Sequence, residues 1–132
     1  MKVKIDTKEK FTVITPEMGC LDDNIAAEIV QVSNNCLLQP VKNIVLNLEN
    51  ITDIENVAAT SIAELQQMAY EQSASFVICS LQKSVEEKLE EAELLETLNV
   101  TPTESEAWDI VQMEEIEREL LDGNDFEFEK NN

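Results

Sequence analysis

The sequence contains no histidine and only two glycines, Gly19 and Gly123. Histidine is the side chain whose ordinary pKa suits it best to acid–base catalysis near neutral pH, and it is a common metal ligand. A phosphate-binding loop or a dinucleotide fingerprint needs several glycines at fixed short spacings. The composition therefore argues against catalysis in general and excludes glycine-rich nucleotide sites in particular.

Cysteine is also scarce. Cys20, Cys36 and Cys79 are odd in number and far apart, and no C-x-x-C pair is present. A zinc site requires closely spaced pairs of thiolate or imidazole ligands. We expect three reduced structural cysteines, with Cys79 in "FVICSL" as a small core residue. No metal and no cofactor is predicted.

Long apolar runs are absent, and aromatic residues are few. Aromatic residues make up 5% of the 132 residues, so the core of this single domain is expected to be aliphatic. No uncharged apolar stretch is long enough to span a bilayer. The N-terminus, "MKVKIDTKEKF", has no apolar region of the kind found in secretory signals. We expect a cytoplasmic protein.

Positive charge is the last deficit. The formal net charge is −19, with 11 acids and six bases in residues 1–85 and 17 acids and three bases in residues 86–132. Binding to phosphate backbones or anionic membranes needs a basic patch. The negative charge therefore disfavours nucleic acid and membrane surfaces as partners, whereas it is compatible with a basic protein partner or with simple solubility.

Hydrophobic periodicity predicts strands that alternate with helices. Strands are expected over 2–6, 10–16, 43–48, 75–81 and 97–100, and helices over about 23–37, 58–70, 84–92 and 103–121. The first two strands should form a hairpin, and the alternation that follows implies helical crossovers between parallel strands. The predicted fold class is α/β, with a mixed, mostly parallel sheet of about 4–5 strands and about four helices.

Capping residues mark three helix starts. Asp22 or Asp23 can cap the first helix, and Ser84 with Glu87 and Thr103 with Glu106 have the spacing of capping boxes. We divide the chain into a domain over 1–121 and an acidic, disordered tail over 122–132.

The last predicted helix carries apolar residues beyond its first turns. Ala107, Trp108 and Val111 are expected to face the core. Ile110, Met113, Ile116 and Leu120 recur at three- and four-residue steps, and Glu114, Glu115, Glu117 and Glu119 should form a solvated opposite face. The apolar stripe is expected to pack on the domain or on another chain, with the domain favoured.

Three segments together resemble a known family. They are "GCLDDNIAAEI" (19–29), "NIVLNLENITDI" (43–54) and "SFVICSLQKSVEEKL" (75–89), and "TPTESEAW" (101–108) adds a fourth, weaker likeness. Over residues 2–115 the chain resembles the STAS domain, a module of sulfate-transporter tails and anti-sigma factor antagonists. The resemblance implies a STAS-like α/β fold.

The resemblance also points to a regulatory loop. In the family an Asp-Ser-Ser-Gly motif enters the second helix, and a partner kinase that doubles as the anti-sigma factor phosphorylates its second serine. Glu55, Asn56, Val57 and Ala58 occupy these positions here. Val57 stands at the phosphoacceptor position and has no hydroxyl, so the switch is predicted to be lost. Asn56 could cap the helix, and Glu55 supplies a permanent negative charge.

Two nearby hydroxyls leave an alternative open. Thr60 and Ser61 lie one turn further into the helix, where such side chains usually bond to a backbone carbonyl. A structural role is favoured for both over a displaced phosphosite.

The resemblance implies a protein-interaction regulator and not an enzyme. Its partner would be a kinase-like anti-sigma factor bound by the 53–64 loop and helix face. The predicted partner-binding residues are Asp53, Glu55, Asn56, Val57, Ala58, Thr60, Ser61 and Glu64. The alternative is a cytosolic STAS subunit that docks on the ATPase of a lipid-transport ABC complex. A third hypothesis, an enzyme that uses Asp53 and Glu55 as acid and base, is disfavoured, and the oligomeric state is left open.

Overall fold

The computed structural model describes residues 3–17 and 19–131, with side chains described as far as Leu121. Its strands are β1 (Val3–Thr7), β2 (Thr12–Pro16), β3 (Cys20–Leu21), β4 (Ile44–Asn47), β5 (Asp53–Ile54), β6 (Phe76–Cys79) and β7 (Val100–Thr101). Its helices are α1 (Asp23–Leu37), α2 (Asn56–Glu71), α3 (Lys83–Glu91) and α4 (Glu104–Asn131). All four predicted helices and all five predicted strands are present, and β3 and β5 are additional.

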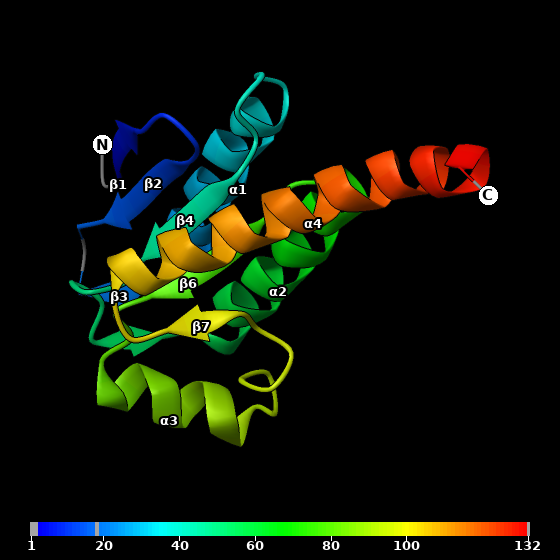
Figure 1. Cartoon of the computed structure of the whole chain (residues 1–132). Helices are drawn as coiled ribbons and strands as arrows, with labels where there is room; N and C mark the ends of the chain where they lie inside the picture. Colours follow the sequence, from blue (N-terminus) through cyan, green and yellow to red (C-terminus); the bar gives the residue numbers. More distant parts are fainter. Residues whose placement is uncertain (1–2, 18, 132) are drawn as a thin grey trace.

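The main sheet has five strands in the order β1-β2-β4-β6-β7. Only β1 is antiparallel to its neighbour, with Ile5 opposite Ile14, and the remaining strands run parallel. The mostly parallel sheet that begins with a hairpin is therefore confirmed. The carboxyl ends of β4, β6 and β7 meet at one edge of this sheet, where α2, α3 and α4 begin (Figure 1).

Each face of the sheet has its own core. The larger core joins alternate residues such as Ile14, Leu46 and Ile78 to α1 and α2. The smaller core joins Val13, Val45, Val77 and Cys79 to Ala107 and Val111 of α4. The alternation of side chains along a strand separates these two sets. The sheet is thus covered by α1 and α2 on one face and by α4 on the other (Figure 1).

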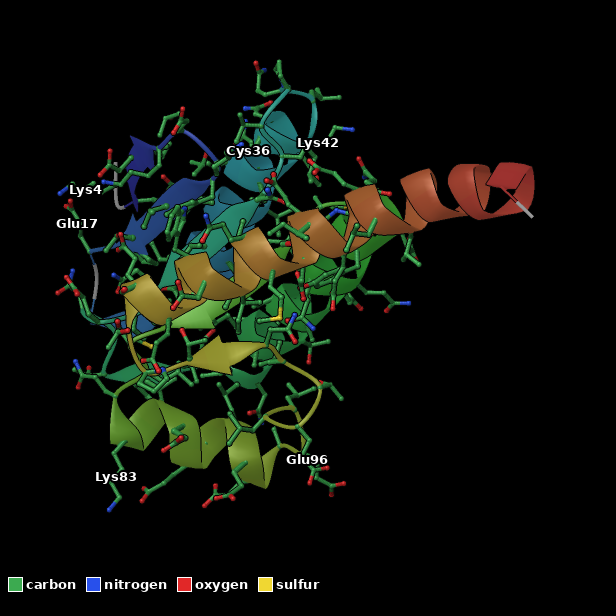
Figure 2. All side chains as sticks on the ribbon, in the orientation of Figure 1. Lys4, Glu17, Cys36, Lys42, Lys83 and Glu96 are labelled. Carbon is green, nitrogen blue, oxygen red and sulfur yellow. The ribbon has the colours of Figure 1, made fainter. Side chains whose placement is uncertain are left out.

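Cysteine and charge are distributed as the sequence suggested. Cys36 and Cys79 are buried, Cys20 is partly buried, and all three are free thiols. The prediction that Cys79 is a core residue is confirmed. Charged side chains, such as Lys83 and Glu96, point into solvent, while Cys36 lies on the buried side of α1 (Figure 2). Among the described residues, no helix combines the length and the apolarity needed to cross a bilayer.

Two of the three predicted caps are confirmed. The Asp22 carboxylate accepts a hydrogen bond from the Ile25 N–H at 2.9 Å, and the Thr103 Oγ1 accepts one from the Glu106 N–H at 3.2 Å. The Ser84–Glu87 capping box is wrong, because the N-cap of α3 is Gln82, two residues before Ser84. The Ser84 hydroxyl is instead used in a contact with the loop before α2.

Helix α4 differs most from the sequence-based expectation. Its backbone is helical through Asn131, so the predicted end near Leu121 is wrong. The sequence has no proline after Pro102 to stop the helix, and Gly123 costs only about 1 kcal/mol in a helix interior. The division into a domain over 1–121 and a separate acidic tail stays a prediction.

The orientation of α4 about its own axis was also predicted incorrectly. Ala107 and Val111 are fully buried and Ile110 is partly buried, as expected. The other predicted apolar contacts fail: the exposed fractions are 36% for Trp108, 57% for Met113, 54% for Ile116 and 55% for Leu120. Most of the stripe therefore does not pack on the domain.

Polar contacts explain this orientation. The Tyr70 hydroxyl and the Ser75 Oγ donate to Glu114 Oε1 at 2.8 and 2.6 Å. Glu115 Oε2 accepts from Asn43 Nδ2 at 2.7 Å. One turn later the Arg118 guanidinium donates to Asn43 Oδ1 at 3.3 Å and to Ser75 Oγ at 3.2 Å. Glu114 and Glu115 thus face the domain, which corrects their assignment to the solvated face.

Candidate protein-interaction site

The predicted site lies at the carboxyl ends of the central strands, where the chain leaves β4 and enters α2. One side of this loop is bound to the segment before α1. The Gly19 carbonyl accepts from the Thr52 N–H at 2.6 Å, the Thr52 Oγ1 at 2.9 Å and the Asp53 N–H at 3.2 Å. The short parallel pair of β3 and β5 continues this contact. Two-residue strands have no periodicity that sequence analysis could detect.

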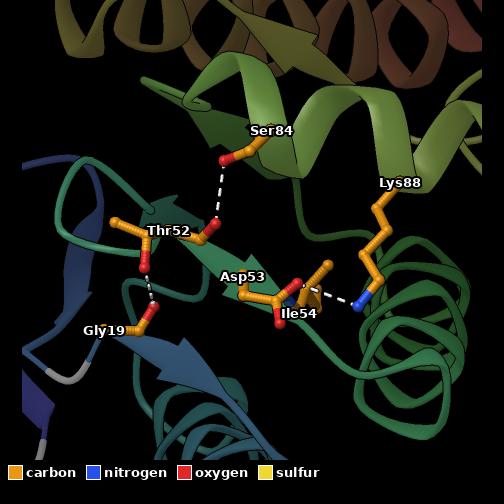
Figure 3. A network of polar contacts seen from close by, with 6 residues as sticks. All are labelled: Gly19, Thr52, Asp53, Ile54, Ser84 and Lys88. Carbon is orange, nitrogen blue, oxygen red and sulfur yellow. Dashed lines mark hydrogen bonds and ion pairs between the residues drawn. The ribbon is translucent and has the colours of Figure 1, made fainter.

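Helix α3 holds the other side of the same loop (Figure 3). The Ser84 Oγ donates to the Thr52 carbonyl at 2.8 Å, and the Lys88 ammonium contacts Asp53 Oδ1 at 2.8 Å. Gln82 Nε2 donates to the Glu49 carbonyl at 2.8 Å. The loop is thereby fixed from two sides before it enters α2. Sequence analysis missed the roles of Ser84 and Lys88, which lie more than 30 residues from the groups that they bind.

The loop surface is acidic. The hydrogen bond from Lys88 holds the pKa of Asp53 below its ordinary value, with help from the Ile54 N–H, and Asp53 in turn raises the pKa of Lys88. Burial raises the pKa of the Cys20 thiol, and the charges of Asp53, Glu55 and Asp22 raise it further. Cys20 is therefore a neutral thiol near pH 7 and a poor nucleophile.

The start of α2 differs from the expected capping. Glu55 is the N-cap residue and Asn56 is the first helical residue, and no side chain caps this end. The prediction that Asn56 caps the helix is therefore wrong, because an N-cap residue must lie outside the helical conformation. The Glu55 carboxylate instead accepts a hydrogen bond from the Asp23 N–H of α1 at 3.2 Å. Glu55 thus connects the starts of the two helices.

Four of the predicted partner-binding residues share one face of α2. Val57, with 61% of its surface exposed, is followed at helical spacing by Thr60, Ser61 and Glu64. Ala58 is fully buried in the larger core and does not reach this surface. Asp53, Glu55 and Asn56 are exposed at the entrance to the helix. Seven of the eight predicted residues are therefore at least partly exposed, on the loop and the first turns of α2.

The hydroxyl and carboxyl groups of this surface have structural partners. The Thr60 Oγ1 donates to the Asn56 carbonyl at 3.0 Å, the back-bond predicted for a helical threonine. Asp53 is paired with Lys88, and Glu55 is bonded to α1. Within the described ranges, no cluster of three or more histidine, cysteine or acidic side chains is arranged to hold a metal ion. What the surface offers is an apolar side chain between polar groups at the start of a helix.

The chain is similar in sequence to one known family and in fold to several solved structures. The family model for the STAS domain matches residues 2–107. No curated protein sequence matches the chain. Among solved structures, a candidate anti-sigma factor antagonist from Thermotoga maritima superimposes with a TM-score of 0.72 at 19% identity, covering 83% of this chain and 94% of the other.

Two further structures show the same fold. An anti-sigma factor antagonist from Mycobacterium paratuberculosis gives a TM-score of 0.71 at 14% identity, covering 83% of this chain and 92% of the other. The anti-sigma factor antagonist SpoIIAA, in its unphosphorylated form, gives 0.67 at 17% identity, covering 83% and 96%. At these identities the likeness concerns the fold.

Proposed function

This chain belongs to the STAS domain family, and from that premise we propose that it is a protein-interaction regulator resembling an anti-sigma factor antagonist. Its partner would be a kinase-like anti-sigma factor of a partner-switching system in the cytoplasm. The proposal includes no catalytic residue, no cofactor and no nucleic acid. Structural relatives described as anti-sigma factor antagonists support the general class of function.

The observation that carries the proposal is the exposed face of α2. Val57, Thr60, Ser61 and Glu64 form a continuous strip, and Val57 is a large apolar side chain that is 61% exposed. A partner that covers this side chain would gain the free energy of removing apolar surface from water. The contacts of the loop with Gly19, Ser84 and Lys88 hold this strip in place before a partner arrives.

The same face supports a constitutive form of binding. Phosphorylation would add about 1.5–2 negative charges to a serine at this position. Val57 cannot accept a phosphate, and the acidic residues Asp53 and Glu55 lie just before it at the entrance to the helix. We propose that the surface stays in one electrostatic state, so that partner levels rather than modification control binding.

Capture from lysate of the native host tests this function. Wild-type chain should retain a kinase-like protein, identified by mass spectrometry, and Val57→Arg or Glu64→Lys should lose it. Leu38→Arg is the matched control, because Leu38 is 80% exposed and lies outside the site, at the C-terminal end of α1. Recovery of a transporter ATPase, or equal recovery by all variants, would contradict the proposal.

A further inference from the structure

Helix α4 carries a second apolar surface that the proposed function does not use. Met113, Ile116 and Leu120 follow one another at three- and four-residue steps and are 57%, 54% and 55% exposed. Leu121 beside them is 64% exposed. Residues at this spacing lie on one side of a helix. We call Met113, Ile116, Leu120 and Leu121 the α4 stripe.

The opposite side of α4 is bonded to the domain, so the α4 stripe faces away from it. Ala107 and Val111 are fully buried. Glu114, Glu115 and Arg118 bond to Tyr70 of α2 and to the residues just before β4 and β6, Asn43 and Ser75. Turning the stripe inward would break these bonds. The stripe also lies on a different side of the molecule from the partner surface of α2, because the sheet separates the two helices (Figure 1).

The charges around the α4 stripe have one sign. Glu106, Asp109, Glu117 and Glu119 are the exposed acids of α4 up to Leu121. Arg118 is the only base in residues 104–121, and its guanidinium is directed at Asn43 and Ser75 of the domain. A second copy of this chain would bring its own acids and its net charge of −19 against this surface. Charge complementarity therefore favours a basic partner over a second copy.

We propose that the α4 stripe is a docking surface for a basic amphipathic helix of a partner protein. The apolar side of that helix would cover Met113, Ile116 and Leu120, and its lysine or arginine side chains would lie against the flanking acids. This is the helix-against-helix mode, in which apolar anchors recur at three- and four-residue steps. The far end of α4 extends past the other elements (Figure 1).

Titration with designed peptides tests the docking surface. The probe is an amphipathic leucine–lysine peptide of about 18 residues, roughly the length of a five-turn helix. It is compared with a scrambled peptide of the same composition and with a leucine–glutamate peptide. The isotope-labelled full chain should show NMR shift changes centred on Met113, Ile116 and Leu120 with the first peptide only. Ile116→Ser should weaken binding about tenfold, as expected for loss of a buried aliphatic side chain.

Two control variants and a light-scattering measurement make the outcome decisive. Leu38→Ser removes an equally large exposed side chain elsewhere, and Val57→Ser changes the α2 surface; both should leave peptide affinity unchanged. Equal affinity for the scrambled peptide, or shift changes outside α4, would overturn the proposal. A wild-type dimer in light scattering that Ile116→Ser dissociates would also overturn it, because a second copy would then cover the stripe. None of these results depends on the α2 partner.

Discussion

At the scale of single side chains, the proposed loss of the phosphorylation switch rests on Val57. We predict that a kinase-type anti-sigma partner with ATP transfers no phosphate to the wild-type chain, because Val57 has no hydroxyl and Thr60 is bonded to the Asn56 carbonyl. Val57→Ser places a hydroxyl at an exposed helix start and should create a substrate. Intact-mass spectrometry after kinase treatment measures both. Stoichiometric phosphate on wild-type Thr60 or Ser61 would show that the switch has moved rather than disappeared.

The Asp53–Lys88 pair gives a pH-dependent prediction. The pKa of Asp53 is lowered in the folded state, chiefly by Lys88, so its contribution to stability is present above the unfolded pKa and is lost as pH falls through the folded value. Lys88→Met should raise the pKa of Asp53 toward its ordinary value, although the Ile54 N–H still lowers it. NMR titration of the Asp53 carboxyl carbon measures this shift.

Lys83→Met is the matched control for that titration, since Lys83 is exposed on the same helix and points away from the loop (Figure 2). It should leave the Asp53 titration unchanged. Both partners of the pair are well exposed, so little change in stability at pH 7 is expected. An Asp53 titration that is the same in Lys88→Met and wild type would refute the assigned cause.

At the scale of elements, the scarcity of glycine leaves a non-glycine residue in the left-handed conformation after α3. Glu93 follows α3 with a positive φ of 61°, and the Leu94 N–H bonds to the Leu89 carbonyl, the pattern that usually places glycine at this position. Glu93→Gly should therefore stabilise the fold by about 0.5–1 kcal/mol. This gain is the backbone strain that glycine relieves, minus the larger conformational entropy that glycine loses on folding. Urea denaturation measures it. Glu90→Gly, inside α3, should destabilise by about 1 kcal/mol, and a loss in both variants would contradict the prediction.

The polar side of α4 is the second test at this scale. Glu114→Ala leaves the Ser75 hydroxyl and the Tyr70 hydroxyl without their acceptor and should lower the free energy of unfolding by about 1–3 kcal/mol. Glu117→Ala, on the exposed side, should change it by less than about 0.5 kcal/mol. Chemical denaturation separates the two.

Tyr70 supplies an independent measurement on the same variant. Burial raises its pKa above the ordinary value, and the hydrogen bond to Glu114 raises it further. Glu114→Ala should therefore lower the pKa of Tyr70, although burial keeps it elevated. Tyr70 is the only tyrosine of the chain, so ultraviolet absorbance follows this group alone. An unchanged titration would mean that the contact is not formed in solution.

The boundary of the domain is a question for the whole molecule. A chain that ends at Leu121 keeps Glu114, Glu115 and Arg118, and we expect its free energy of unfolding to stay within about 0.5 kcal/mol of the full chain. A chain that ends at Gln112 loses these contacts and should be less stable by roughly 3–5 kcal/mol. Thermal and urea denaturation of the three chains compare them. Equal stability of all three would show that the second half of α4 contributes nothing to the domain.

The sequence by itself determined the order of elements, the hairpin, the parallel sheet and the family, because strand alternation, helical spacing and caps such as Asp22 and Thr103 are local signals. It also placed Val57 at an exposed helix start. Local signals could not identify the β3–β5 pair or the use of Ser84 and Lys88, since these contacts join residues far apart in the chain.

Only the tertiary structure decided which side of α4 faces the domain. The sequence offered an apolar stripe and an acidic side, and apolar burial alone would have chosen the stripe. Hydrogen bonds from Asn43, Tyr70 and Ser75 reversed the choice. Turning the stripe inward would leave the buried Ser75 and Asn43 without these partners, at about 1–3 kcal/mol for each group, and would also expose Ala107 and Val111. These contacts together set the orientation of the helix.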